Sequence, residues 1–212
     1  MFQLDDILEQ WATIYTPLSH DPGAATKPKD RAFFRIDRLD QENEWTRNEN
    51  LIQHPCLLFS TAVEAQLSQQ NPKRIERPYD MYLAVPQRSV NNAQQTGIEA
   101  TRCKRQLDQM ACDLVAFLFD LQDYCSNSSW PHRDTPPDVR QIGEHLDREQ
   151  RQQVRGLRME QTQWWSTPLA FGRWWLLGLE LSGLDPRPLC IVPSRYRSFT
   201  AEPEPTATGN QP

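Results

Sequence analysis

The sequence predicts an α+β fold, with a mixed, mostly antiparallel sheet, one long helix packed on one face and a short N-terminal helix. Two observations support this prediction. Several strand-like segments follow one another without intervening helices, which favours antiparallel pairing. One segment, residues 101–125, repeats apolar side chains at helical spacing over a longer stretch than any other. A sheet and a helix that are each apolar on one side bury those sides against each other.

The chain begins with an amphipathic helix over residues 2–15. Its apolar side chains recur at helical spacing: Leu4, Ile7, Leu8, Trp11 and Ile14. Three strands are expected next, at residues 31–37, 54–63 and 78–87, with Pro55 at a strand start, where a missing N–H costs least. The polar segment 38–50, which carries paired carboxylates, is interpreted as a solvated connection.

The long helix over residues 101–125 is the clearest element of the chain. Its apolar stripe consists of Leu107, Met110, Ala111, Leu114, Phe117, Leu118 and Leu121. At 1.5 Å per residue this helix is about 35 Å long. Because it has one apolar stripe, we expect it to lie across one face of the sheet and to leave the other face only partly covered.

We expect one domain over residues 1–183, with a long polar excursion at 126–156 and a Pro-rich extension at 184–212 whose end is disordered. Residues 139–155 have helical spacing but little apolar surface, which predicts a marginal helix or a mobile excursion. Their apolar side chains are Val139, Ile142, Leu146 and Val154. Within the extension, residues 188–192 are a candidate short edge strand.

Composition excludes some classes of function. The net charge of −5 argues against general nucleic-acid binding, which favours a clearly basic face. No apolar run is long enough for a transmembrane helix, and the N-terminus lacks the basic and apolar regions of a signal peptide. The five cysteines are scattered without a CxxC pair, which is typical of a reduced, cytoplasmic protein with free thiols.

Three weak patterns could carry chemistry, and each has a simpler interpretation. His54 and Cys56 flank a proline and could bind a metal, but a strand-entry histidine beside a small buried cysteine fits better. His132 begins an HRD triplet that lacks the other kinase motifs. Cys103, followed by two basic residues, could be a reactive thiol, but a structural cysteine is favoured. We therefore expect no catalytic residue, no cofactor and no metal site.

A β-hairpin is the last element, formed by residues 157–168 and 174–183 with the turn at 169–172. Side chains of its second strand alternate between two faces. One face carries Trp175, Leu177, Leu179 and Leu181, and the other carries Trp174, Leu176, Gly178 and Glu180. Both faces are apolar where the strand begins, so each needs a cover.

The long helix can cover one of these faces, and we expect a second subunit to cover the other. The expected interface residues are Trp164, Trp174 and Leu176 on the hairpin, with Tyr82 on the neighbouring strand. Tryptophan is enriched both in cores and at interfaces. The alternative, in which the hairpin tryptophans only fill a core between sheet and helices, therefore stays open.

The order of these elements, with "HPCLLFS", "YDMYLAV" and the helix "RCKRQLDQMACDLVAFL", resembles the tail terminator, or tail completion, proteins of long-tailed bacteriophages. More specifically, these segments are similar to small structural proteins of prophages in Bacteroides-like bacteria. The resemblance covers residues 1–183 and implies a virion structural protein without catalytic residues. In that family, identical subunits form a ring that caps the tail tube and meets the head connector, through heterologous contacts.

The resemblance implies that the partners are further copies of the chain and tail-tube or head-connector proteins, without a membrane or specific nucleic-acid binding. It implies the host cytoplasm as the location before incorporation into the virion. An alternative function is an adaptor or accessory subunit of a contractile injection apparatus, with the same fold and another partner. A further alternative is a small cytoplasmic hydrolase that uses Cys103 or His132.

Overall fold

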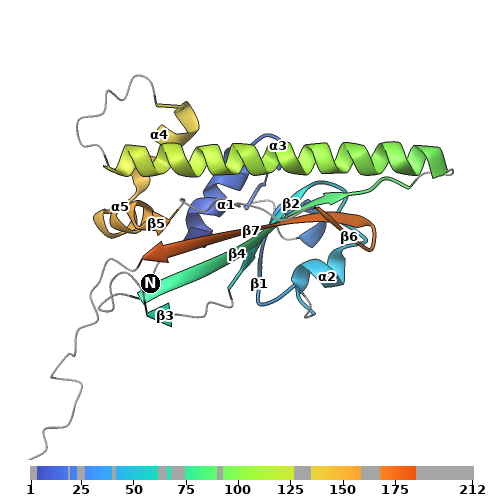
Figure 1. Cartoon of the computed structure of the whole chain (residues 1–212), viewed down its shortest axis with the longest axis horizontal. Coiled ribbons are helices and arrows are strands. Elements are labelled where there is room, and N and C mark those ends of the chain that lie inside the picture. The colour runs from blue at the N-terminus through green and yellow to red at the C-terminus, as the bar shows by residue number, and fades with distance from the viewer. Residues whose placement is uncertain are drawn as a thin grey trace, which may run out of the picture.

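The structure is a computed structural model of the whole chain, shown in Figure 1. It describes residues 4–18, 20–22, 27–39, 42–61, 66–67, 75–89, 93–126, 135–158 and 168–184. The helices are α1 (Leu4–Ile14), η1 (Pro28–Asp30), α2 (Glu44–Asn48), α3 (Ala93–Ser126), α4 (Pro137–His145) and α5 (Arg148–Arg155). The strands are β1 (Phe33–Ile36), β2 (Cys56–Ser60), β3 (Gln66–Leu67), β4 (Ile75–Pro86), β5 (Leu157–Arg158), β6 (Leu169–Phe171) and β7 (Trp174–Leu184).

These strands form one sheet in the order β1-β2-β4-β7-β5, with β3 paired to β4 and β6 paired to β7. Only β1 and β2 run parallel, and the other pairs of described strands are antiparallel. The centre of the sheet is a long ribbon in which β4 and β7 pair from Glu76↔Leu184 to Pro86↔Trp174. The α+β fold with a mixed, mostly antiparallel sheet is therefore confirmed.

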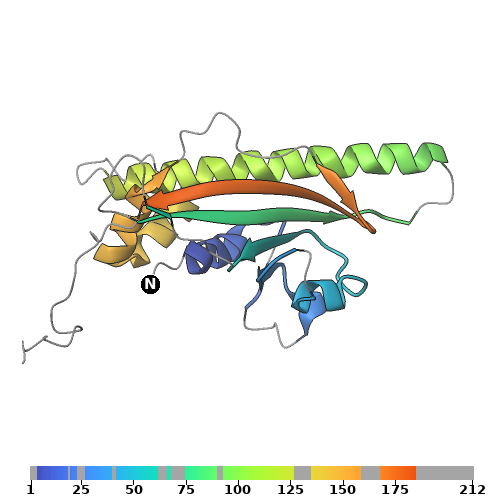
Figure 2. The same ribbon diagram turned by 60° about the horizontal axis from the view of Figure 1, so that its bottom comes forward.

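The long helix α3 crosses one face of this sheet, as the sequence predicts (Figures 1 and 2). It has 34 residues, which makes it about 51 Å long, and it begins at Ala93 rather than near residue 101. Residues 93–98 are all exposed, so no apolar stripe marks these first turns in the sequence. All seven side chains of the predicted stripe are buried in the core between α3, α1 and the sheet.

The N-terminal helix α1 packs into the same core with the predicted face. Leu4, Ile7, Leu8 and Trp11 are buried, and Ile14 is partly buried against them. The ring of Trp11 stacks on Tyr15 with 4.4 Å between centroids. No helix within the described ranges is long and apolar enough to cross a lipid bilayer.

The second face of the sheet is closed by α2, which the sequence analysis interpreted as part of a solvated connection. Asn43 caps α2 through a reciprocal pair of bonds with Thr46: its side-chain oxygen accepts from the Thr46 N–H, and its own N–H donates to the Thr46 hydroxyl. The cap fixes Trp45 beneath the sheet, where it is fully buried. This small second core also contains Phe34, Ile36, Ile52, Cys56, Leu58, Ala84, Trp174 and Leu176.

Residues 137–155 form two helices, α4 and α5, rather than a marginal helix or mobile excursion. Both pack beside the C-terminal half of α3, as Figure 1 shows. The four apolar side chains of the prediction are all buried: Val139, Ile142, Leu146 and Val154. Asp147 separates the two helices and caps α5, because its side chain accepts from the Gln150 N–H. All four belong to the main core, which α4 and α5 join beside α3.

The hairpin turn lies three residues later than predicted. The expected turn residues 169–171 are strand β6, and the chain reverses at Gly172 and Arg173, so that Phe171 pairs with Trp174. Gly172 has φ +57°, a conformation that favours glycine. Residues 157–158 pair with β7 as expected, while 159–167 lie outside the described residues, as does the extension after Leu184.

Candidate functional site

The structure corrects the prediction that Trp174 and Leu176 are interface residues covered by a second subunit. Trp174 is fully buried and Leu176 is 6% exposed in the single chain. The ring of Trp45 meets Trp174 edge-on from α2, with 5.4 Å between centroids. Because the chain itself covers both side chains, neither offers surface to a second subunit. The sequence signal for this contact was Trp45, a single tryptophan within the polar segment 38–50.

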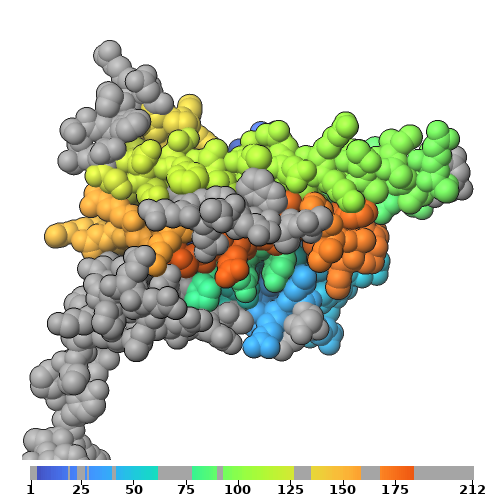
Figure 3. Space-filling model, in the orientation of Figure 1, coloured from blue at the N-terminus to red at the C-terminus, as the bar shows by residue number. Residues whose placement is uncertain are grey.

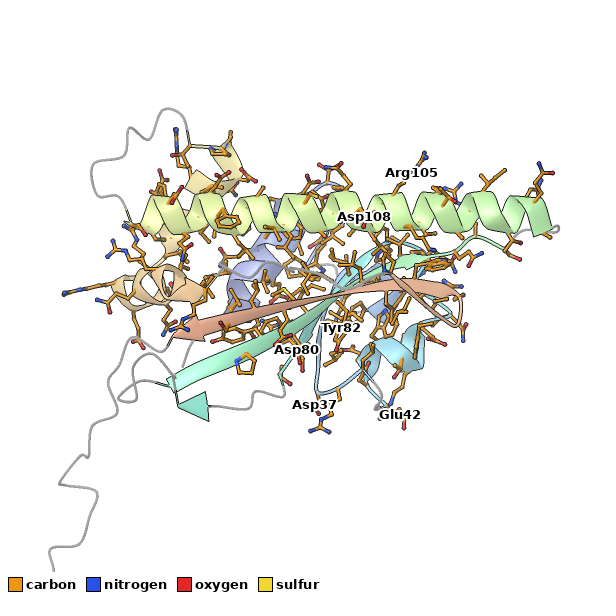
Figure 4. The ribbon with its side chains drawn as sticks, viewed as in Figure 1. Asp37, Glu42, Asp80, Tyr82, Arg105 and Asp108 are labelled. Atoms are coloured by element: carbon orange, nitrogen blue, oxygen red, sulfur yellow. The ribbon has the colours of Figure 1, made fainter. Side chains whose placement is uncertain are left out.

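The other two predicted interface residues stay predictions. Tyr82 on β4 is partly exposed and packs at the border of the second core. Figure 4 shows it on the ribbon together with Asp80, on the side of the molecule that carries Asp37 and Glu42. Trp164 lies outside the described residues.

Three exposed apolar side chains lie on the segments that flank this second core, and the Phe171 ring lies 6.1 Å from that of Trp45 between centroids. Leu51 is 60% exposed, Leu169 is 66% exposed and Phe171 is 39% exposed. Arg173 in the hairpin turn donates to the carbonyl oxygens of Asn50 and Ile52 and so holds the turn against the segment after α2. Figure 3 shows the β6 end of the hairpin adjoining α2 on the molecular surface. We call Leu51, Leu169 and Phe171 the β6 patch.

The second candidate surface is the outer edge of β1. Two bonds define how β1 pairs: the Leu57 N–H donates to the Ala32 oxygen, and the Thr61 N–H donates to the Ile36 oxygen. In a parallel ladder with this register, the residues that bond to β2 alternate along β1. The backbone N–H and C=O groups of Phe33 and Arg35 therefore point away from β2, toward the open edge.

This edge opens into a cavity of about 300 Å³, which we call the β1 groove. Side chains of β1 line it together with Glu9 and His20 on one side and Glu44 on the other. Arg31 donates to both carboxylate oxygens of Glu44, each at 2.8 Å. This bidentate ion pair links Arg31, just before β1, to α2. No described strand pairs with the outer edge of β1.

The N-terminal turns of α1 make one end of the β1 groove acidic. Arg35 donates to Asp5 at 2.6 Å and to Asp6 at 2.8 Å, and it lies 2.9 Å from Glu9. One guanidinium thus faces three carboxylates. Partial burial, and then the charge of Asp5, raise the pKa of Asp6, while Arg35 opposes this shift. Arg35 and these three carboxylates, those of Asp5, Asp6 and Glu9, together carry a net charge of −2 when all are ionised.

His20 lies beside Glu9 in the lining of the β1 groove and is buried. Its Nδ1 accepts a bond from the Ala32 N–H at 3.2 Å, so Nε2 carries the proton that faces Glu9 Oε1 at 3.4 Å. Burial lowers the pKa of His20, and Glu9 works in the opposite direction. The imidazole joins the loop after α1 to the start of β1.

The weak patterns of the sequence do not converge in the described part of the chain. The His54 ring nitrogens lie 3.1 Å from the Pro55 oxygen and 2.9 Å from the Lys29 oxygen. Cys56 is fully buried, and burial raises the pKa of its thiol. Among the described residues no cluster of three or more His, Cys, Asp or Glu side chains could hold a metal ion. His132 lies outside these residues, and the absence of a metal site stays a prediction.

Cys103 does not lie in the first turn of its helix, as it would in the expected helix over residues 101–125. Since α3 begins at Ala93, the thiol is in the third turn and too far from the helix N-terminus to gain from it. It is buried, and burial raises its pKa although Arg102 opposes the shift. Glu99 is mostly buried beside it and accepts from the Arg88 N–H and from Arg102. These contacts tie the loop after β4 to α3.

No protein-family model, no curated protein and no solved structure matches this chain.

Proposed function

We propose that this protein is a virion structural subunit that assembles with copies of itself into a ring at the tail end or head–tail junction of a bacteriophage. The sequence resemblance supports the phage part of this proposal, and the fold has the element order on which that resemblance depends. The ring would form in the host cytoplasm before incorporation into the virion and would meet tail-tube or head-connector proteins.

The β6 patch is the observation that supports self-assembly. All three residues of β6 are exposed, and two of them are large and apolar. Fully burying an exposed leucine or phenylalanine side chain contributes roughly 1.5–3 kcal/mol. Because the three side chains of the patch are 39–66% exposed, each can contribute only part of that value to one contact. Apolar side chains gathered on a polar surface are typical of interaction sites.

The chain also offers a second, different surface in the β1 groove. A contact between two different surfaces repeats from copy to copy, and it closes into a ring when the rotation allows. The protomer thus has the two unlike surfaces that a head-to-tail ring requires. This arrangement replaces the predicted contact through Trp174 and Leu176, which are buried.

Light scattering on the purified protein tests the proposal. A double variant, Leu169→Ser with Phe171→Ser, should lower the mass of the assembly while its circular dichroism spectrum stays that of the wild type. Phe119→Ser is the matched control, because Phe119 is 42% exposed on α3, away from the β6 patch. An assembly that loses mass equally in the control, or keeps its full mass in the double variant, contradicts the proposed role of the β6 patch.

A further inference from the structure

We propose that residues 189–192 of a neighbouring copy add to the outer edge of β1 as a parallel strand, and that Arg195 and Arg197 of that copy then lie at the acidic end of α1. This inference rests on the proposed self-assembly and names the occupant of the β1 groove. It would make each subunit give a strand to one neighbour and take a strand from the other.

The edge of β1 has the free groups that strand addition needs. Phe33 and Arg35 present their N–H and C=O groups outward, as the two bonds at the ends of the β1–β2 ladder define. An added strand pairs with such groups through main-chain bonds. The edge is only four residues long and carries Arg35, so a long or cationic strand pairs with it poorly.

The segment 189–192 matches this edge in length and composition. It lies between Pro188 and Pro193, which limit it to four residues, the length of β1. Its residues are Leu189, Cys190, Ile191 and Val192, and β-branched side chains favour strands. A four-residue strand between two prolines therefore matches β1 in length, and the prolines end the pairing on both sides.

Charge determines the direction of the added strand. Asp5 and Asp6 contact Arg35, near the C-terminal end of β1, and the exposed Asp37 follows directly after that strand. A parallel strand continues past this end, so the two arginines that follow it reach the carboxylates. An antiparallel strand would carry them to the opposite end, beside Arg31. Figure 4 labels Asp37 on the side of the sheet opposite to α3.

The reach of the chain indicates that the strand comes from a neighbour. Leu184 pairs with Glu76, whereas Phe33 is aligned through Leu57 with Leu83, seven residues further along β4. Seven residues of strand span about 23 Å, and the added strand lies four strand spacings from β7, about 19 Å. The separation from Leu184 is therefore about 30 Å, but the five residues from 184 to 189 span at most about 18 Å.

Hydrogen exchange of the full chain tests this inference at the two outward amides. The N–H groups of Phe33 and Arg35 should exchange at least about tenfold more slowly in the assembly than in dilute monomer, because the added strand accepts from them. Ile191→Pro removes a main-chain donor from the added strand and should abolish the slowing. Gly209→Pro is the control, since it makes the same change in the extension outside the pairing segment.

Substitution of Asp5 and Asp6 provides a second test, which does not depend on the variants at Ile191 and Gly209. Asp5→Asn with Asp6→Asn removes the carboxylates that face the arginines and should reduce the slowing about tenfold. Asp108→Asn removes an exposed carboxylate on α3, the helix on which Figure 4 labels Asp108, and should have no effect.

Light scattering on the same samples separates this inference from the proposed function. Slowing that rises with concentration and disappears in Ile191→Pro supports the exchanged strand. Slowing that is independent of concentration means that the chain covers its own edge and overturns the inference. An assembly without any slowing overturns the inference but leaves self-assembly intact, and a protein that stays monomeric at every concentration, also with tail-tube protein added, contradicts both.

Discussion

Trp45 on α2 meets Trp174 on β7 edge-on, with 5.4 Å between ring centroids, and both side chains are fully buried. This pair joins the shortest α-helix of the described chain to its longest ribbon. It explains how a chain with two apolar faces on one strand buries both of them, with α3 on one side and α2 on the other.

Trp45→Ala should lower the free energy of unfolding by about 3–5 kcal/mol, because it removes the main cover of the second core and leaves a cavity against Trp174. Urea unfolding followed by circular dichroism measures this loss. Ile98→Ala on α3, where Ile98 is 65% exposed, should change stability by less than about 0.5 kcal/mol. A loss below about 1 kcal/mol for Trp45→Ala would show that the second core does not depend on α2.

Two glycine substitutions should act in opposite directions. Gly172→Ala should destabilise the protein by about 1–2 kcal/mol, because φ at this turn is +57° and disfavours a Cβ. Gly97→Ala should stabilise it by up to about 1 kcal/mol, since Gly97 lies in α3. A Cβ at either position meets no atom within 4 Å, so both effects come from the backbone alone. Thermal unfolding distinguishes the signs, and equal signs would contradict the turn conformation.

Stability should fall as the pH drops below about 6.5, the ordinary pKa of histidine, in part because of His20. Burial lowers the folded-state pKa of His20, so the unfolded chain takes up a proton at a higher pH than the folded chain does. The groups that influence this imidazole are Glu9, Asp21 and Arg31. The loss levels off once the pH lies below the folded-state pKa.

Replacing His20 isolates its share of this pH dependence. His20→Asn keeps an acceptor for the Ala32 N–H but cannot titrate, so urea midpoints between pH 7 and pH 5 should change less than in the wild type. His145→Asn, at an exposed histidine, should leave the wild-type profile unchanged. Identical profiles for His20→Asn and the wild type would exclude His20 as the source.

Iodoacetamide should label Cys112 before the three thiols that are buried in the described part of the chain, Cys56, Cys103 and Cys125. Burial raises the pKa of Cys103, and that of Cys125 to about 11, so both thiols stay protonated at pH 6. Peptide mapping by mass spectrometry identifies the labelled sites. Fast labelling of Cys103 at pH 6 would instead support the hydrolase alternative.

The sequence predicted the elements that carry a long periodic signal. Leu107 to Leu121 on α3 and Leu4 to Trp11 on α1 repeat at helical spacing, and their apolar faces became the faces of the main core. The strand β2 is apolar from Cys56 to Phe59 and is buried on both sides, which made it recognisable without alternation.

The second core could not be predicted in the same way. α2 has five residues, too few for a period to show, and Trp45 is its one buried side chain. Its capping residues Asn43 and Thr46 are polar, and such residues are as typical of a loop as of the start of a helix. Without α2, the face of Trp174 and Leu176 looks open, so the sequence assigned it to a second subunit. The β6 patch was missed because Leu169 and Phe171 were interpreted as turn residues.

Native mass spectrometry of the full chain at rising concentrations tests the central claim, head-to-tail self-assembly through the β6 patch, most directly. The account predicts one closed species of at least three copies, which the Leu169→Ser and Phe171→Ser double variant does not form. A dimer that grows no further would indicate a symmetric contact and contradict the ring, as would a protein that stays monomeric even with tail-tube protein added.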